Sequence, residues 1–74
     1  MPTLDLHGEK YESVQHKVHS FVYNNDLPVR IITGKSSPMR KIVIDTISLL
    51  GYHAHYERLI NEGCLVVTEQ EFIL

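Results

Sequence analysis

The chain lacks the features of disulfide-stabilised proteins and of membrane-spanning proteins. It holds one cysteine, Cys64, which rules out an intrachain disulfide and, inside an apolar run, is typical of a small buried side chain. No segment approaches the roughly 20 apolar residues of a membrane span, and the N-terminus lacks the basic and apolar regions of a signal peptide. We therefore expect a cytoplasmic protein without a membrane partner.

Internal repeats, low-complexity tracts and linker-like Gly/Ser runs are also missing. The 74 residues, 43% of them hydrophobic, are enough to bury one small core. We therefore predict a single domain from residue 1 to residue 74.

Acidic residues are absent from one stretch of an otherwise acidic chain. The net charge of −2 argues against strong nonspecific binding to nucleic acid. Between Leu27 and Lys41, however, the chain has no acid and four cations, which are Arg30, Lys35, Arg40 and Lys41. This run predicts a local positive patch, and an ordinary solvated helix start is the alternative.

Apolar residues recur at helical spacing in two segments. The first helix is expected over residues 9 to 23, and the cluster from Asn24 to Pro28 ends it. The second begins with Ser37 as N-cap and Pro38 at the first helical position, and Gly51 ends it. The predicted buried stripes are Tyr11, Val14, Val18, Phe21 and Val22 in the first helix and Met39, Ile42, Val43, Ile47 and Leu50 in the second.

Strand-like runs alternate with these helices. They are residues 4 to 7, residues 29 to 33, and a closing hairpin with strands over 52 to 59 and 64 to 68 around a turn at 61 to 63. The order β-α-β-α-β-β requires a parallel pair joined by a right-handed crossover. We therefore predict an α/β two-layer sandwich, in which both helices cover one face of a four-stranded mixed sheet.

Two segments at the ends of the parallel strands carry candidate chemistry. In Leu4-Asp5-Leu6-His7-Gly8, strand alternation places Asp5 and His7 on one face and the two leucines toward the core. The run from Ile31 to Lys41 passes from an apolar strand through a small-residue turn into a basic helix start, and such a turn can receive a phosphate. Because parallel strands bring their carboxyl ends together, we expect an acid/base pair beside an anion site.

Both segments resemble the signatures of the Smr domain, the small MutS-related domain. Its LDxH motif is complete at residues 4 to 7, and its TGxG motif matches at Thr33 and Gly34 but has Ser36 in place of the last glycine. Residues 63 to 67 also look like the family's final strand, so the resemblance covers nearly the whole chain. It implies a fold similar to the C-terminal domain of bacterial translation initiation factor three. It also implies binding to nucleic acid and, as in many members, endonuclease activity on RNA or structured DNA.

The resemblance and the chemistry of the side chains suggest roles for individual residues. His7 is the natural proton-transfer group, and Asp5 would orient it, raise its basicity or bind a metal. The expected phosphate-binding residues are Gly34, Lys35, Ser36, Ser37, Arg40 and Lys41. A divalent cation such as Mg²⁺ is a candidate cofactor, and no metal ligands are assigned. A larger protein or ribosomal partner is expected to select the target, because a domain of 74 residues has few ways to be sequence-specific.

A second function class stays open. The Cβ of Ser36 limits positive φ and close backbone approach, and together with the net negative charge it favours a non-catalytic module for nucleic acid or a ribosome-associated partner. The intact LDLH segment favours the endonuclease. A purely protein-binding domain that retains the fold is a weaker third possibility.

Other patterns carry less weight. A Walker A loop is excluded, because Val29 stands where that motif requires glycine. The pairs His16/His19 and His53/His55 could each supply two metal ligands but have no evident further partners. Tyr52 and Tyr56 could stack on bases, although half-buried strand tyrosines are the ordinary case.

Overall fold

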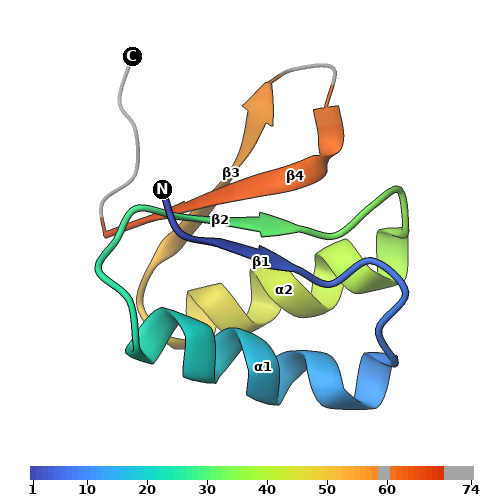
Figure 1. Ribbon diagram of the computed structural model, residues 1–74, viewed down its shortest axis with the longest axis horizontal. Helices are drawn as coiled ribbons and strands as arrows, with labels where there is room; N and C mark the ends of the chain where they lie inside the picture. The colour runs from blue at the N-terminus through green and yellow to red at the C-terminus, as the bar shows by residue number, and fades with distance from the viewer. Residues whose placement is uncertain (59–60, 70–74) are drawn as a thin grey trace.

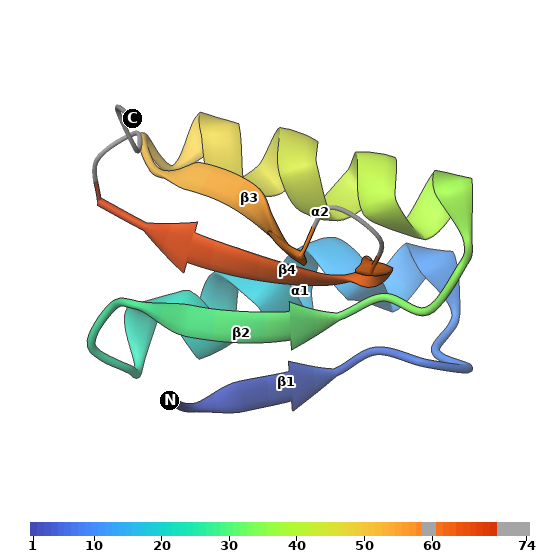
Figure 2. The ribbon, with the colours of Figure 1, turned by 90° about the horizontal axis from the view of Figure 1, so that it is seen from above.

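Two helices lie side by side on one face of a four-stranded sheet in the computed structural model, which describes residues 1–58 and 61–69 (Figure 1). The strand order is β1-β2-β4-β3, in which β1 and β2 are parallel and the other neighbours antiparallel (Figure 2). The predicted α/β class and element order are confirmed. The elements are β1 (Thr3–Asp5), α1 (Tyr11–Tyr23), β2 (Val29–Ile32), α2 (Ser37–Leu49), β3 (His53–Arg58) and β4 (Asn61–Thr68).

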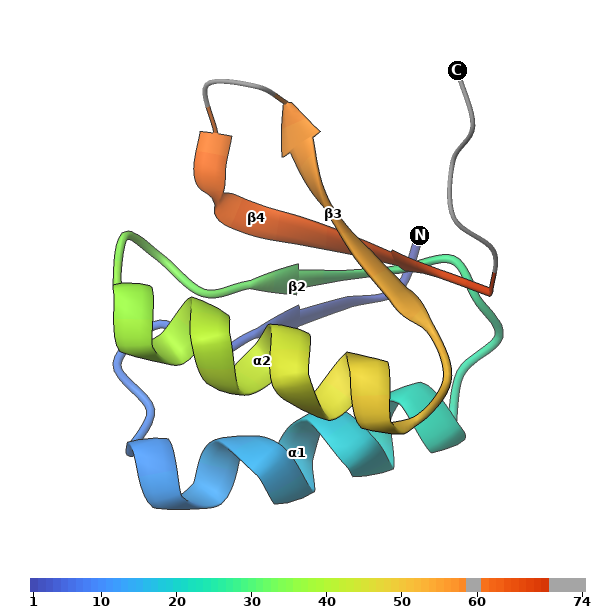
Figure 3. The same ribbon diagram turned by 180° about the vertical axis from the view of Figure 1, so that it is seen from behind.

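The core lies between the sheet and the two helices (Figure 3). Strand alternation turns Val29 and Ile31 of β2, and Leu65 and Val67 of β4, toward the helices, as the burial pattern of β2 shows. The other sheet face carries more polar side chains, among them an ion pair between Arg30 and Glu57. The buried core residues are Leu6, Val14, Val18, Val22, Val29, Ile31, Met39, Val43, Ile47, Leu65 and Val67. In the described part of the chain, no helix is both long enough and apolar enough to cross a membrane.

The element boundaries differ from the predicted ones at the two helix starts. The first helix begins at Tyr11 rather than at residue 9, because Lys10 has an extended backbone with ψ 136°. The second begins at Ser37, and its N-cap is Ser36 rather than Ser37. Pro38 is therefore the second helical residue.

The strand ends differ too. The predicted first strand includes His7, but β1 ends at Asp5 and the last ladder bond runs from the N–H of Leu6 to the carbonyl of Ile32. The predicted turn at residues 61 to 63 is wrong, because Asn61 to Gly63 belong to β4. The predicted strand end at residue 59 lies outside the described residues. Hydrogen bonding with backbone that is distant in sequence decides where these strands end. Local turn patterns do not predict such pairing.

Candidate functional site

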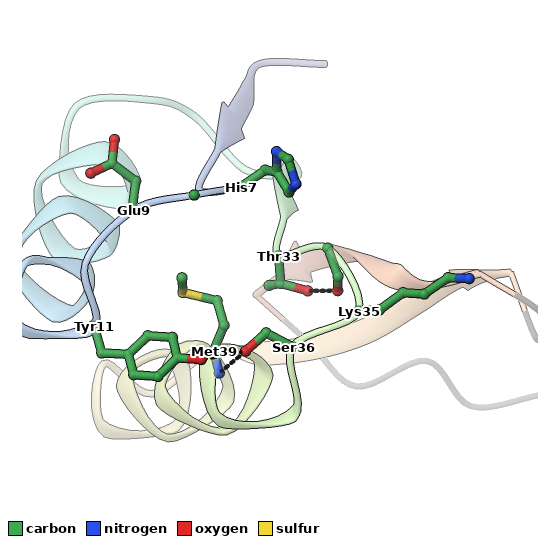
Figure 4. A pocket seen from close by; sticks show the side chains of 9 residues that line it. His7, Glu9, Tyr11, Thr33, Lys35, Ser36 and Met39 are labelled. Carbon is green, nitrogen blue, oxygen red and sulfur yellow. Dashed lines mark hydrogen bonds between the residues drawn. The ribbon is translucent and has the colours of Figure 1, made fainter.

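An open hollow lies where the parallel strands β1 and β2 end (Figure 4). Its volume of about 480 Å³ falls in the range of pockets that hold small ligands. The carboxyl ends of parallel strands are the usual ligand edge of an α/β sheet. The hollow is lined by His7, Gly8, Glu9, Tyr11, Thr33, Gly34, Lys35, Ser36 and Met39.

His7 and Gly34 meet at this edge although 26 residues lie between them in the chain. Gly34 has a positive φ of 68°, and a Cβ added to it would lie 3.3 Å from Cδ2 of His7. Glycine therefore does two things here: it permits the left-handed turn and leaves room for the imidazole. The structure thus brings the ends of both motif segments together.

Asp5 does not pair with the imidazole as its strand position suggested. Its Oδ1 accepts a hydrogen bond from the backbone N–H of His7 at 2.9 Å. Because β1 ends at Asp5, His7 lies in a turn, where strand alternation no longer applies. In the described hydrogen bonds the carboxylate of Asp5 shapes the turn that presents His7.

Gly63 supports the Gly34 turn from β4. Its carbonyl accepts hydrogen bonds from the backbone N–H groups of Thr33 at 2.9 Å and Gly34 at 3.2 Å. A Cβ on Gly63 would lie 3.3–3.4 Å from the backbone of Gly34, so the Gly34 turn and β4 approach each other closely. The sequence pattern predicts a turn at Gly63 and gives no sign of this role, because no local pattern signals a contact between segments so far apart.

Ser36 fits the turn without strain. Its φ is −78°, so the last position of the glycine motif does not need the left-handed region in this chain. Its Oγ accepts a hydrogen bond from the N–H of Met39 at 3.2 Å and shares another with the hydroxyl of Tyr11 at 2.9 Å. Ser36 acts as the N-cap of α2, and its limit on positive φ has no effect at this position, whereas its limit on close approach of a ligand to the backbone stays a prediction.

Lys35 is the one cation of the predicted patch that lines the hollow among the described residues. Figure 4 shows its side chain extending away from the other lining side chains. Glu9 brings a carboxylate to the same hollow, but Lys17 binds this carboxylate at 2.7 Å. The local charge of Glu9 is thus offset by a neighbour on α1.

The remaining predicted cations lie elsewhere. Nη2 of Arg40 donates to Oγ of Ser37 at 2.9 Å, so these two predicted binding residues contact each other on the first turn of α2. Nζ of Lys41 binds Asp45 at 3.0 Å one turn further along. Arg30 is ion-paired on the uncovered sheet face. Proximity in sequence therefore does not gather these charges into one patch at the hollow.

Tyr11, Glu9, Thr33 and Met39 line the hollow but were not singled out as site residues. Tyr11 was assigned to the buried stripe of the first helix, yet it is 49% exposed. Thr33 is buried, and its hydroxyl donates to the carbonyl of Gly34 at 2.9 Å. The position of Tyr11 at the very start of a helix was a weak signal, because a first-turn residue can extend past the edge of the sheet.

The metal hypotheses gain no support from the described residues. Across residues 1–58 and 61–69, no three His, Cys, Asp or Glu side chains gather in a way that could hold a metal ion. The rings of His53 and His55 stack on each other with centroids 6.4 Å apart. Tyr52, one of the two tyrosines considered for stacking, packs against the core instead.

The hollow combines an exposed imidazole, an ammonium group at the rim, hydroxyls and a buried thioether. Such a set can bind an anion and move a proton beside it. The chain matches no family model, no curated protein and no solved structure at a significant level.

Proposed function

We propose that the hollow binds the phosphodiester backbone of a nucleic acid and that His7 transfers a proton during its cleavage. The observation that carries the proposal is the closeness of the His7 imidazole to the Gly34 turn at the start of α2, where an added Cβ would lie 3.3 Å from the ring. The resemblance of both segments to the Smr signatures supports the same function. The proposal places the protein in the cytoplasm, with RNA or structured DNA as its partner.

Phosphate binding is supported by the charges around the turn. The first turn of α2 has no acidic residue, so the positive end of the helix dipole faces the hollow without a competing carboxylate of its own helix. Lys35 adds a full positive charge at the rim. Pro38 has no N–H and the N–H of Met39 is taken by Ser36, so these two amides are not donors for the phosphate.

Proton transfer is supported by the place and exposure of His7. An imidazole can act as a base that takes the proton of the attacking water or 2′-hydroxyl, or as an acid that protonates the leaving oxygen when the P–O bond breaks. The hydrogen bond between Asp5 and the His7 backbone holds the turn that carries the ring. Asp5 is thus a positioning residue in this proposal.

A non-catalytic nucleic-acid-binding module is the second candidate, and one observation favours it. The described hydrogen bonds engage the carboxylate of Asp5 with backbone rather than with the imidazole. Among the residues that the structure describes, no carboxylate is hydrogen-bonded to the His7 imidazole in the way that commonly orients a catalytic histidine. Binding without turnover would follow from this arrangement.

A cleavage assay separates the two candidates. The parent protein, His7→Ala and the control His16→Ala are incubated with end-labelled RNA and with single-stranded, nicked and branched DNA, with and without chelator. His16 is a suitable control because it is exposed on α1 and does not line the hollow. Cleavage by the parent and by His16→Ala, lost in His7→Ala, is the expected result for an endonuclease.

The other outcomes are equally decisive. Binding without cleavage in all three proteins would establish the non-catalytic module. Cleavage that survives in His7→Ala would remove His7 from the reaction. A parent protein that binds none of these nucleic acids would refute both candidates.

A further inference from the structure

Tyr11 is an aromatic side chain that is half exposed inside the hollow. It is the first residue of α1 and is 49% exposed, whereas Val14, Val18 and Val22 of the same helix are buried. In Figure 4 its ring and the His7 imidazole lie on opposite sides of the hollow. The ring contributes little to the core, so its place needs another explanation.

The ring of Tyr11 is held at both ends. Its backbone belongs to α1, and its hydroxyl shares a 2.9 Å hydrogen bond with Oγ of Ser36, the N-cap of α2. An aromatic ring fixed in this way loses little conformational entropy when a ligand stacks on it. Glycine at position 36, as in the TGxG motif, would have no hydroxyl to hold the ring.

The hollow also offers an apolar surface that phosphate binding does not use. Met39 lines the hollow but is only 2% exposed, so the apolar surface open to a ligand is chiefly the ring of Tyr11. Gly8 leaves open space, because a Cβ added there would meet nothing within 4 Å. A phosphate needs donors and charge, whereas an aromatic ring beside a thioether suits a flat, apolar ligand group.

We propose that Tyr11 stacks on an unpaired base of a single-stranded nucleic acid whose phosphate lies at the Gly34 turn. The inference rests on the proposed function and narrows its substrate class. The hydroxyl of Tyr11 lies one hydrogen bond from Ser36, so ring and turn are within the span of neighbouring groups of one nucleotide. A base in a duplex is already stacked on its neighbours, so this site selects single strands.

Binding of fluorescent oligonucleotides tests the proposal by anisotropy. The probes are a short single strand, the same strand with abasic sites, and the matching duplex. The proteins are the parent, Tyr11→Leu, Tyr11→Phe and the control Tyr23→Leu, in which a tyrosine 83% exposed at the other end of α1 is replaced. Thermal unfolding of each variant establishes that it is folded.

The expected result is that Tyr11→Leu binds the single strand about tenfold more weakly, since base stacking on an aromatic ring contributes on that order. Tyr11→Phe keeps the ring but loses its hydrogen bond to Ser36, so it binds more tightly than Tyr11→Leu and more weakly than the parent, and Tyr23→Leu equals the parent. Abasic sites weaken binding to the parent but not to Tyr11→Leu, because that variant has no ring to lose. Duplex binding is the same in all four proteins.

Two failures are distinguishable. If Lys35→Ala weakens binding and Tyr11→Leu binds the single strand as tightly as the parent, the stacking site is refuted and phosphate binding stands. If the parent prefers the duplex, or loses nothing with abasic sites, the stacking site is likewise refuted. A parent that binds no probe refutes the proposed function, and this inference with it.

Discussion

Gly34 and Gly63 make the hollow through backbone alone. Gly34 supplies the left-handed turn beside His7, and Gly63 supplies a carbonyl and the space for close approach. A side chain on Gly34 would crowd the His7 ring, and one on Gly63 would crowd the backbone of Gly34. At the scale of single residues, the shape of the site thus depends on two positions where glycine has no side chain.

Gly34→Ala is expected to lower the free energy of unfolding by about 1–2 kcal/mol, because an L residue at φ 68° is strained. It is also expected to weaken nucleic-acid binding, since its Cβ would lie 3.3 Å from Cδ2 of His7 and displace the ring by a few tenths of an ångström. Gly51→Ala is the matched control, because Gly51 has φ 85° with open space around its Cβ position. Urea unfolding and oligonucleotide titration of both variants check this.

The control must lose stability and keep binding. Equal binding by Gly34→Ala and the parent would show that the turn does not form the phosphate site.

Burial raises the pKa of the Cys64 thiol to about 11, with a further rise from its hydrogen bond to Glu57 and the charge of that carboxylate, against a lowering by Arg30. In the unfolded chain the thiol ionises near 9.0. The unfolded state therefore releases this proton first, and the free energy of unfolding falls as pH rises from about 9 to about 11.

Comparison of the parent with Cys64→Ala by urea unfolding from pH 8 to pH 11 isolates this contribution. The parent should lose more stability across that range than the variant, whatever their difference at pH 8. Parallel curves for the two proteins would contradict the raised pKa.

At the scale of elements, the start of α2 joins stability to the site. Ser36 caps the helix through Met39 and holds Tyr11 through the same oxygen. The residue that departs from the glycine motif is thus the one that connects the two helices at the hollow. A change there should be visible both in folding and in the geometry of the ring.

Ser36→Ala is expected to lower the free energy of unfolding by about 1 kcal/mol through loss of the N-cap. Ser36→Gly should have a smaller effect on stability, a few tenths of a kcal/mol from the cap, but should release Tyr11 equally. Ser37→Ala serves as the control, since Ser37 is not the N-cap. Urea unfolding measures the stabilities, and Tyr11 ring signals in NMR spectra report the release.

A larger loss of unfolding free energy in Ser37→Ala than in Ser36→Ala would show that Ser37 is the N-cap, as the sequence pattern predicts.

At the scale of the whole molecule, charge limits how nucleic acid is held. The net charge is −2, and the cations around the turn are spread over several surfaces. Affinity must therefore come from few phosphate contacts together with shape and stacking. A weak dependence on salt is the physical consequence.

The logarithm of the binding constant for a single strand is expected to fall with the logarithm of salt concentration with a slope of about −1 to −2. Lys35→Gln should bring this slope closer to zero by about 0.7, the value for one phosphate contact with a single strand. Lys41→Gln should leave it unchanged, because Lys41 pairs with Asp45 away from the hollow. Titrations at three or more salt concentrations measure the slopes. A steeper slope, or one that depends on Lys41, would restore the basic patch predicted from the sequence.

Much of the fold could be predicted because its signals are local. Helical spacing from Val14 to Val22 and β-branched runs such as Val29 to Ile32 identify their elements without reference to distant residues. The element order then leaves few topologies, and the mixed sheet with a parallel β1–β2 pair is among them. The meeting of His7 and Gly34 at one edge follows from that topology.

The contacts within the site could not be predicted in the same way. The carboxylate of Asp5 turned to a backbone N–H because the strand ended two residues before His7. The carbonyl of Gly63 reached the Gly34 turn from another strand, and Arg40 and Lys41 found partners on their own helix. Each of these hydrogen bonds and ion pairs depends on which partner lies nearest in the folded structure. The order of residues alone does not specify this.

The sequence by itself determined the helices, the strands and the edge at which the motif residues meet, because apolar periodicity and chain connectivity are properties of the order of residues. Only the tertiary structure decided that Ser36 is a cap, that Tyr11 faces the hollow and that Gly63 supports the turn. These three facts depend on distances of a few ångströms between segments far apart in the chain, and such distances exist only once the core has packed.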